Sequence, residues 1–262
     1  MNNLAQEVPL AIVLNGINFS VILVSPFDLD DFIFGYLHSE SVIRAKHDIH
    51  DIDIHVSNEL PDYGALIAEV TLSNRSLSGL QKRQRTLKGA SGCGLCGTES
   101  LVAAFPELTA INYSSNITLA SLSGVKEQLR EHQHRADSTG ALHGAFWLSN
   151  VGEISICRED IGRHNALDKL LGYLLAQRIS VKSGAVLVTS RCGIELVQKT
   201  VLMGVPTLIS LASPTQFAVT FARKYGLTLI HVPKQDEPYY LVQHVNKGVE
   251  APDFEKICEL KL

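Results

Sequence analysis

Between residues 141 and 232, short apolar runs alternate with longer segments of helical periodicity. Strands are expected at residues 185–190, 207–211 and 227–232, with helices at 194–203 and 215–225 between them. A helix that connects two consecutive strands in this way normally joins parallel neighbours. Two such connections in a row predict a sheet with parallel strands and helices on both faces.

The same part of the chain contains further elements ahead of these crossovers. Strands are expected at residues 141–148 and 153–157, and helices at 119–133 and 163–177. Leucines recur at helical spacing in the last of these segments, which predicts one apolar face turned toward the sheet. Together these elements predict a mixed α/β sheet for residues 116–262.

The first part of the chain has a different pattern. Apolar runs at residues 10–14 and 17–24 flank Asn15-Gly16, the pair that a type I′ hairpin turn favours. An amphipathic helix is expected from Leu29 to Leu37, and two half-buried strands at residues 52–56 and 66–72. Residues 1–115 are therefore predicted to form a separate α+β domain.

A cationic segment without apolar periodicity ends this first domain. It contains five basic residues between positions 75 and 88 and leads into the Cys93-x-x-Cys96 motif, which is surrounded by glycines. We expect residues 73–98 to form a mobile loop, because they have no apolar face to bury, followed by a short helix through Phe105.

Composition and charge exclude several classes of protein. Lys and Arg total 23 against 27 Asp and Glu, so the net charge is −4 and a protein that binds nucleic acid through a general positive charge is not expected. No apolar run approaches the roughly 18 residues of a membrane span. No Lys or Arg precedes Arg44, so a secretory signal is not expected either. We therefore expect a cytoplasmic protein without nucleic-acid or membrane partners.

The Cys93-x-x-Cys96 motif offers two thiols with little bulk around them. Upstream cations favour the thiolate, which is the nucleophilic form of cysteine. Half of a structural zinc site and a thioredoxin-type disulfide are the alternatives. The other three cysteines, at positions 157, 192 and 258, are scattered singly, which disfavours a closed four-ligand metal site. We expect no tightly held metal, and we expect the other cysteines to be small apolar residues.

Polar residues crowd the predicted turn between strand 153–157 and helix 163–177. Asp160, Arg163 and His164 would face a ligand there, or they would only cap the helix within an ion-pair network. His143 begins another strand and suits either a site or a hydrogen-bonded core position. Arg191 precedes a helix, where the helix N-terminus favours a phosphate.

These segments carry a resemblance to a known protein family. In order along the chain, the family pattern is matched by Gly35-Tyr36-Leu37-His38-Ser39-Glu40, Ser91 to Gly97, Thr139-Gly140-Ala141-Leu142-His143, Glu159 to Lys169, Ser190-Arg191, Glu195 to Lys199 and Leu227 to Ile230. The chain thus resembles the FdhD/NarQ family over about residues 8 to 232. Members of that family are sulfur carriers required for formate dehydrogenase activity.

The resemblance implies a fold and an activity. The fold of residues 116–262 would be similar to that of cytidine deaminases. Cys93 and Cys96 would be the catalytic pair of a sulfurtransferase that takes persulfide sulfur from a cysteine desulfurase, with Cys93 the first choice as carrier. The sulfur would pass to the bis-guanine-dinucleotide form of the molybdenum or tungsten cofactor. The alternative is a cofactor-binding chaperone that moves no sulfur. A zinc-dependent deaminase is disfavoured, because His143 is followed by Gly144-Ala145 and lacks the required His-x-Glu sequence.

The resemblance also implies partners and cofactor contacts. The partners would be a cysteine desulfurase, formate dehydrogenase and a second copy of the chain. The chain departs from the family pattern at residues 231–237, where Lys234 takes the place of an arginine and supplies a point charge rather than a two-pronged contact. The residues expected to bind the guanine nucleotide of the cofactor are His143, Asp160, Arg163, His164, Arg191 and Lys234.

Overall fold

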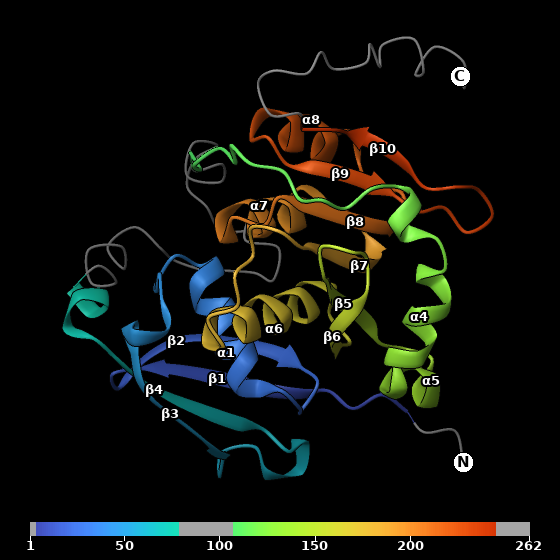
Figure 1. The fold of residues 1–262 in the computed structure, drawn as a ribbon. Coiled ribbons are helices and arrows are strands. Elements are labelled where there is room, and N and C mark those ends of the chain that lie inside the picture. Colours follow the sequence, from blue (N-terminus) through green and yellow to red (C-terminus); the bar gives the residue numbers. More distant parts are fainter. Residues whose placement is uncertain (1–3, 79–106, 245–262) are drawn as a thin grey trace.

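Two sheets with helices between them make up the protein (Figure 1). The computed structural model describes residues 4–78 and 107–244. Within these ranges the first sheet has the strand order β2-β1-β4-β3 and the second has the order β10-β9-β8-β7-β5-β6. The prediction of an α+β unit followed by a mixed sheet with helices is confirmed, while the more specific likeness to cytidine deaminases stays a prediction.

The first sheet begins with the predicted hairpin. Strand β1 (Val8–Leu14) pairs antiparallel with β2 (Ile17–Val24), and Asn15 and Gly16 have φ angles of 50° and 79°, as a type I′ turn requires. Strand β4 (Leu66–Leu72) pairs parallel with β1 and antiparallel with β3 (Ile49–Val56). Two short 3-10 turns, η1 (Lys46–Asp48) and η2 (Pro61–Tyr63), lie in the connections.

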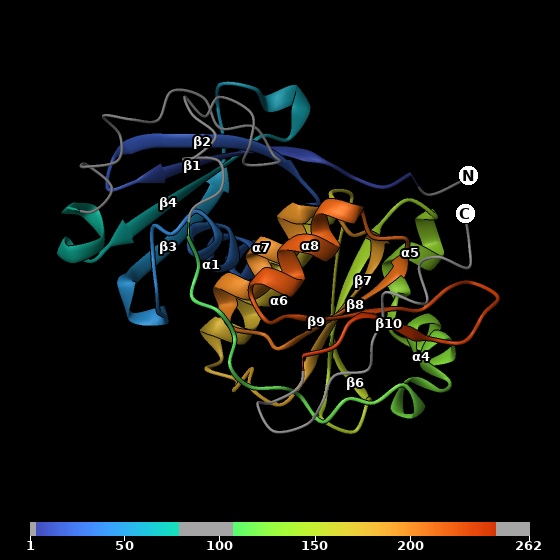
Figure 2. The same ribbon diagram turned by 90° about the horizontal axis from the view of Figure 1, so that it is seen from above.

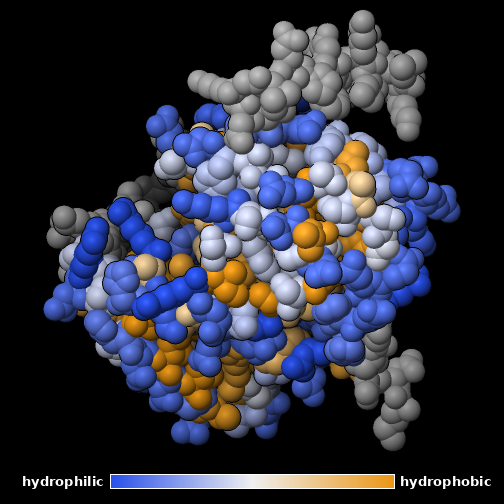
Figure 3. All heavy atoms as spheres, viewed as in Figure 1, coloured by the Kyte–Doolittle hydropathy of each residue, from blue (hydrophilic) through white to orange (hydrophobic). Residues whose placement is uncertain are grey.

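Helix α1 (Leu29–Ser39) covers one face of this sheet. Its stripe of Phe32, Ile33, Tyr36 and Leu37 packs on the alternate inward residues of β1 and β4 and forms the core of the first unit. Figure 3 shows hydrophobic side chains gathered over the part of the molecule that holds the first sheet.

The second sheet contains the predicted crossovers. Strands β7 (Ala185–Arg191), β8 (Thr207–Ala212) and β9 (Thr228–His231) are parallel neighbours, joined by α7 (Ile194–Met203) and α8 (Gln216–Lys224). Strand β5 (His143–Leu148) is antiparallel to both β6 (Ile154–Asp160) and β7. Helix α6 (Arg163–Ala176) follows β6.

Helices cover both faces of this sheet, as predicted. Helices α6, α7 and α8 pack with one another and with one face of the sheet in a single large core (Figure 2). On the other face, the 3-10 turn η3 (Ala120–Leu122) and helix α4 (Val125–His132) cover a smaller core.

Two details of the second unit differ from the predictions. The helix expected at residues 119–133 is broken, because Gly124 adopts a left-handed φ of 77° ahead of α4, and a separate helix α5 (His134–Thr139) follows. Strand β10 (Tyr239–Val242) was missed, since its four residues are placed by antiparallel pairing with β9 at the sheet edge.

The connection from the first unit runs along the second. Ile111 N donates to the carbonyl of Tyr225 at 2.9 Å, and Tyr113 Oη donates to the carbonyl of Gly204 at 2.5 Å. The division of the chain at residues 115/116 stays a prediction. In the structure, the packing of this connection on the second sheet begins before that point.

Glycines allow the two units to meet closely. A Cβ on Gly35 of α1 would lie 1.8 Å from the carbonyl oxygen of Asp168 on α6, and a Cβ on Gly172 would lie 1.8 Å from the carbonyl oxygen of Asp31. The backbones of α1 and α6 therefore touch at positions where any side chain would collide. This contact fixes how the first unit sits on the helices of the second.

Candidate functional site

One edge of the second sheet collects most of the predicted site residues. Because β5 is antiparallel to both of its neighbours, β5 begins at the edge where β6 and β7 end. His143 is the first residue of β5, Asp160 the last of β6 and Arg191 the last of β7. In open α/β sheets, ligands bind at the carboxyl ends of parallel strands. This edge is therefore the candidate site.

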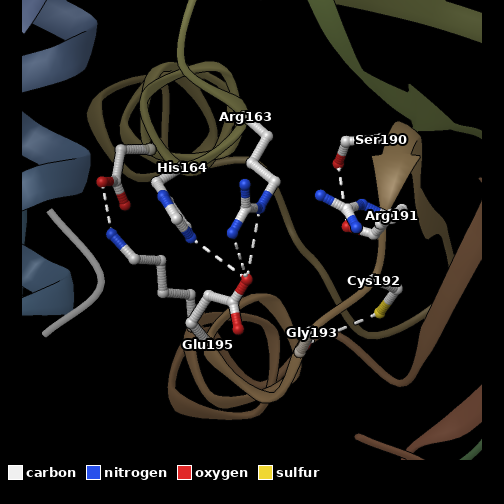
Figure 4. A network of polar contacts seen from close by, with 9 residues as sticks. Arg163, His164, Ser190, Arg191, Cys192, Gly193 and Glu195 are labelled. Atoms are coloured by element: carbon white, nitrogen blue, oxygen red, sulfur yellow. Dashed lines mark hydrogen bonds and ion pairs between the residues drawn. The ribbon is translucent and has the colours of Figure 1, made fainter. Parts of the chain in front are cut away.

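An ion cluster joins the first turns of α6 and α7 at this edge (Figure 4). Oε1 of Glu195 accepts hydrogen bonds from Nε and Nη2 of Arg163, at 3.3 and 3.1 Å, and lies 3.1 Å from Nε2 of His164. Burial acts to raise the pKa of the Glu195 carboxyl, but the contacts with His164, its own backbone amide and Arg163 outweigh burial and lower the pKa to about 2. Glu195 is therefore a carboxylate at neutral pH.

The backbone at Gly193 leaves room for this carboxylate. An added Cβ at Gly193 would lie 2.1 Å from Oε2 and 2.5 Å from Oε1 of Glu195. Gly193 is the residue before the first turn of α7, so the carboxylate folds back over the N-terminus of its own helix. The helix dipole favours a negative charge in that place.

His143 lies close to Arg163 and His164. Burial lowers its pKa from the usual value of 6.5, and the nearby Arg163 and His164 lower it further, while Asp160 acts in the opposite direction. His143 is therefore a neutral imidazole at neutral pH. It can donate or accept a hydrogen bond at the edge where Arg163 and the Glu195 carboxylate lie.

Arg191 and Lys234 are both exposed, but they occupy different surroundings. The Arg191 side chain extends from the end of β7 toward the side on which Arg163 lies (Figure 4). Lys234 lies in the connection between β9 and β10, where its carbonyl oxygen accepts a hydrogen bond from Nζ of Lys126 on α4 at 3.1 Å. The structure thus brings His143, Arg163, His164 and Arg191 to one edge, and it ties the backbone of Lys234 to α4.

Asp160 is buried and paired within the protein. Its side chain is 0% exposed and forms an ion pair with Lys169 Nζ at 2.7 Å. It also accepts hydrogen bonds from the backbone amides of Ser25 and Gly162 and from Nδ2 of Asn165, at 2.9, 2.8 and 3.0 Å. These four donors occupy both carboxylate oxygens. The predicted contact with the cofactor is therefore replaced by a structural role, since Ser25 belongs to the first unit.

Lys169 completes this buried connection and was not among the predicted site residues. Its ammonium also donates to the carbonyl oxygens of Ser25 and Glu159, at 3.1 and 3.3 Å, and lies 4.3 Å from the centre of the Phe27 ring. Burial lowers the pKa of Lys169, and Asp160 opposes that shift. The pair links the two units through the residues that follow β2.

A second contact between α6 and α7 was also missed. Asp168 pairs with Lys199, and Ser39 Oγ of α1 donates to Asp168 Oδ1 at 2.6 Å. Asp168 lies four residues after His164, and Lys199 lies four residues after Glu195, so α6 presents an imidazole and a carboxylate on one face and α7 presents a carboxylate and an ammonium. This spacing was a readable signal for paired helices.

Cys93 and Cys96 lie outside the described residues, as do residues 79–98 of the loop expected at 73–98 and the short helix through Phe105. The start of that expected loop is helical instead, at residues 74–78, where Leu77 N donates to the carbonyl of Ser73 at 3.0 Å. Among the described cysteines, burial raises the pKa of the thiols of Cys157 and Cys192 to about 12. Both thiols stay protonated at neutral pH and are poor nucleophiles. Cysteine chemistry, if it occurs in this chain, does not start from these two residues.

Two kinds of feature are absent from the described ranges, residues 4–78 and 107–244. These ranges contain no group of three or more His, Cys, Asp or Glu side chains placed to hold a metal ion. They also contain no helix that is long and apolar enough to cross a membrane.

Comparison with known proteins finds relatives that share one name. The chain is 40% identical over 230 residues to the sulfur carrier protein FdhD of Cupriavidus necator, which covers 87% of this chain and 77% of the relative. It is 36% identical over 247 residues to the sulfur carrier protein FdhD of Xanthomonas oryzae pv. oryzae, covering 94% and 86%.

A solved structure shows the same fold. A crystal structure described as that of a formate dehydrogenase accessory protein from Desulfotalea psychrophila superimposes with a TM-score of 0.66 at 26% identity, covering 91% of this chain and 87% of the other. The sequence profile of the FdhD/NarQ family matches residues 5–244. The edge that carries Arg163, His164, Arg191 and Glu195 is therefore part of a protein that belongs to the FdhD/NarQ family.

Proposed function

We propose that this protein carries sulfur as a persulfide on the Cys93-x-x-Cys96 pair and delivers it to a guanine-dinucleotide form of the molybdenum or tungsten cofactor for formate dehydrogenase. The proposal rests on the family, whose relatives are named sulfur carriers, and on the glycine-flanked pair of thiols in the sequence. The reaction would take place in the cytoplasm, where free thiols persist.

The first step is transfer of sulfur from a donor desulfurase. The Cys93 thiolate attacks the terminal sulfur of the donor persulfide, a sulfur–sulfur bond forms on Cys93, and the donor cysteine leaves as a thiolate. The electron count of this exchange balances without an external oxidant or reductant. Cys157 and Cys192 do not compete in this step, because both thiols are protonated.

The second step releases the sulfur to the cargo. The Cys96 thiolate attacks the inner sulfur, on Cys93, the terminal sulfur leaves as hydrosulfide, and the two cysteines are left as a disulfide. The thiols supply the two electrons that reduce the sulfur, and a cellular dithiol restores the pair. A second cysteine at this spacing is therefore useful to a carrier.

The nucleotide of the cargo is proposed to bind at this sheet edge. Arg163 and His164 come from one motif of the sequence and Arg191 from another, and the three meet at the carboxyl ends of β6 and β7. This convergence is the structural observation that carries the proposal, because guanidinium groups bind phosphates through charge-assisted hydrogen bonds. Lys234 is proposed as a further contact, made by its exposed side chain. We also propose that the protein works as a homodimer.

Mass spectrometry after incubation with a cysteine desulfurase and cysteine tests the sulfur step. We expect the protein to gain the mass of one sulfur atom, and we expect Cys93→Ala to lose this gain together with support of formate dehydrogenase. Cys157→Ala is the matched control, since it removes one half-buried thiol and keeps the pair.

Two other outcomes would contradict the proposal. Binding of a guanine nucleotide without any gain of sulfur would identify a cofactor-binding chaperone instead. Unfolding of Cys93→Ala would indicate that the pair is structural, as in half of a zinc site.

A further inference from the structure

Glu195 occupies the donors that a ligand phosphate needs. A single oxygen, Oε1, takes the Nε and Nη2 groups of Arg163 and lies against Nε2 of His164. The Nε and Nη2 groups form the edge of a guanidinium that binds a phosphate with two parallel hydrogen bonds. In the free protein this edge already has an anion on it.

The position of the carboxylate depends on the local backbone. The two carboxylate oxygens fill the space that a side chain at Gly193 would take. The Glu195 side chain is only 13% exposed and is turned toward its own helix N-terminus. Glu195 thus lies against Arg163, His164 and the helix end in the way that a bound phosphate would.

Arg191 lies at the same edge as Arg163 but, among the described residues, has no carboxylate on its guanidinium. Its side chain is exposed, and within residues 4–78 and 107–244 no ion pair or hydrogen bond of its guanidinium is seen. An incoming anion can meet Arg191 directly, but it reaches the Nε–Nη2 side of Arg163 and Nε2 of His164 only by displacing a carboxylate. Repulsion between that carboxylate and a phosphate opposes binding as long as both remain.

We propose that Glu195 competes with the ligand: its carboxylate holds Arg163 and His164 in the free protein, and a phosphate of the guanine nucleotide takes its place on these two side chains. This inference rests on the proposed nucleotide site. A ligand that competes with an internal carboxylate for the same donors dissociates more readily than a ligand without such a competitor. Such behaviour suits a protein that passes its cargo on.

Calorimetry with GDP on the full-length chain tests the competition. Glu195→Gln keeps the shape of the side chain and removes its charge, so we expect it to bind GDP about threefold to tenfold more tightly than the unmodified protein. The gain should disappear when Arg163→Ala is also present, because the contested guanidinium is then missing. Binding of guanosine, which has no phosphate, should not change.

Two further variants separate the charge from its position. Gly193→Ala keeps the Glu195 charge and forces the carboxylate away from Arg163, so it should also tighten GDP binding, by a smaller factor. Asp30→Asn removes one exposed charge from the first turn of α1 and should leave GDP binding unchanged. Thermal unfolding of each variant shows whether it is folded.

The outcomes distinguish this inference from the proposal on which it rests. One outcome would contradict the competition alone: GDP binds, Arg163→Ala weakens GDP binding, and Glu195→Gln binds GDP no more tightly than the unmodified protein. Glu195 would then orient Arg163 and His164 for the ligand, and the proposed competition would be wrong. If neither the unmodified protein nor any variant binds GDP at millimolar concentration, the proposed nucleotide site is wrong, and the proposed competition is then wrong as well. Tighter binding by Asp30→Asn would overturn the inference as well, because the effect would then come from net charge alone.

Discussion

Two regions of the molecule share one short stretch of sequence and use it differently. Asp160 and Lys169 are both 0% exposed and join the two units, whereas Arg163 and His164, which lie between them in the sequence, reach the sheet edge with side-chain exposures of 36% and 16%. A strand end followed by a helix turns neighbouring residues to opposite sides. Charged residues close together in the sequence therefore need not belong to one site, and substitutions in the two regions should have different effects.

Loss of the buried carboxylate should have the largest effect on stability. Asp160→Ala leaves Lys169 as a buried charge without its partner, so we expect the free energy of unfolding to fall by about 3–5 kcal/mol. Urea denaturation measures this difference, with the exposed Asp30→Asn as control. A loss below about 1 kcal/mol would show that water or a rearranged side chain replaces the carboxylate.

The next largest effect is expected where α1 meets α6. Gly35→Ala places a Cβ 1.8 Å from the carbonyl oxygen of Asp168, so the two helices must separate, at a cost of about 3 kcal/mol. Gly124→Ala meets no atom within 4 Å and tests the conformational effect of a left-handed residue alone. Equal losses in the two variants, measured by urea denaturation, would mean that close packing is not the cause.

Substitution at the sheet edge should change binding and leave stability nearly unchanged. Arg191→Ala removes an exposed guanidinium, so GDP binding should weaken by about 1.5–3 kcal/mol, the scale of a hydrogen bond to a charged group. Calorimetry measures the change. Affinity equal to that of the unmodified protein would place the nucleotide elsewhere.

The smallest effect concerns stability in acid. The pKa of Glu195 is lowered from 4.5 to about 2 in the folded protein, so its contribution is present above pH 4.5 and is lost as the pH falls toward 2. Since Arg163 is partly exposed and screened, this contribution is about 1 kcal/mol at most. Glu195→Gln should lower the free energy of unfolding near neutral pH, and the difference should vanish toward pH 2. A difference independent of pH would assign the effect to packing.

Much of the secondary structure was predictable from local sequence signals. The helix expected at residues 194–203 has those bounds in the structure, and the Asn15-Gly16 turn has the expected geometry. Local signals failed where a single backbone conformation or a long-range pairing decided the outcome. Gly124 divides a segment that reads as one helix, and β10 depends on its pairing with β9.

The candidate site was predictable only in part, because the sequence does not show which partner a charge will find. Asp160 looked like a ligand contact, and its role as a buried partner depends on Ser25, which lies 135 residues earlier. Glu195 and its contact with Arg163, 32 residues earlier, were not anticipated as a functional unit. The available signal was the spacing of four residues between His164 and Asp168 on α6 and between Glu195 and Lys199 on α7.

By itself the sequence determined the order of the main strands and helices and some of the residues that reach the sheet edge, because periodicity and turn chemistry are local properties of the chain. Only the tertiary structure decided which charges are buried as partners and which remain available to a ligand. The reason is physical: a buried charge requires a partner within hydrogen-bond distance, and that partner comes from a distant part of the chain. The close approach of α1 to α6 and the carboxylate of Glu195 on Arg163 are both results of that packing.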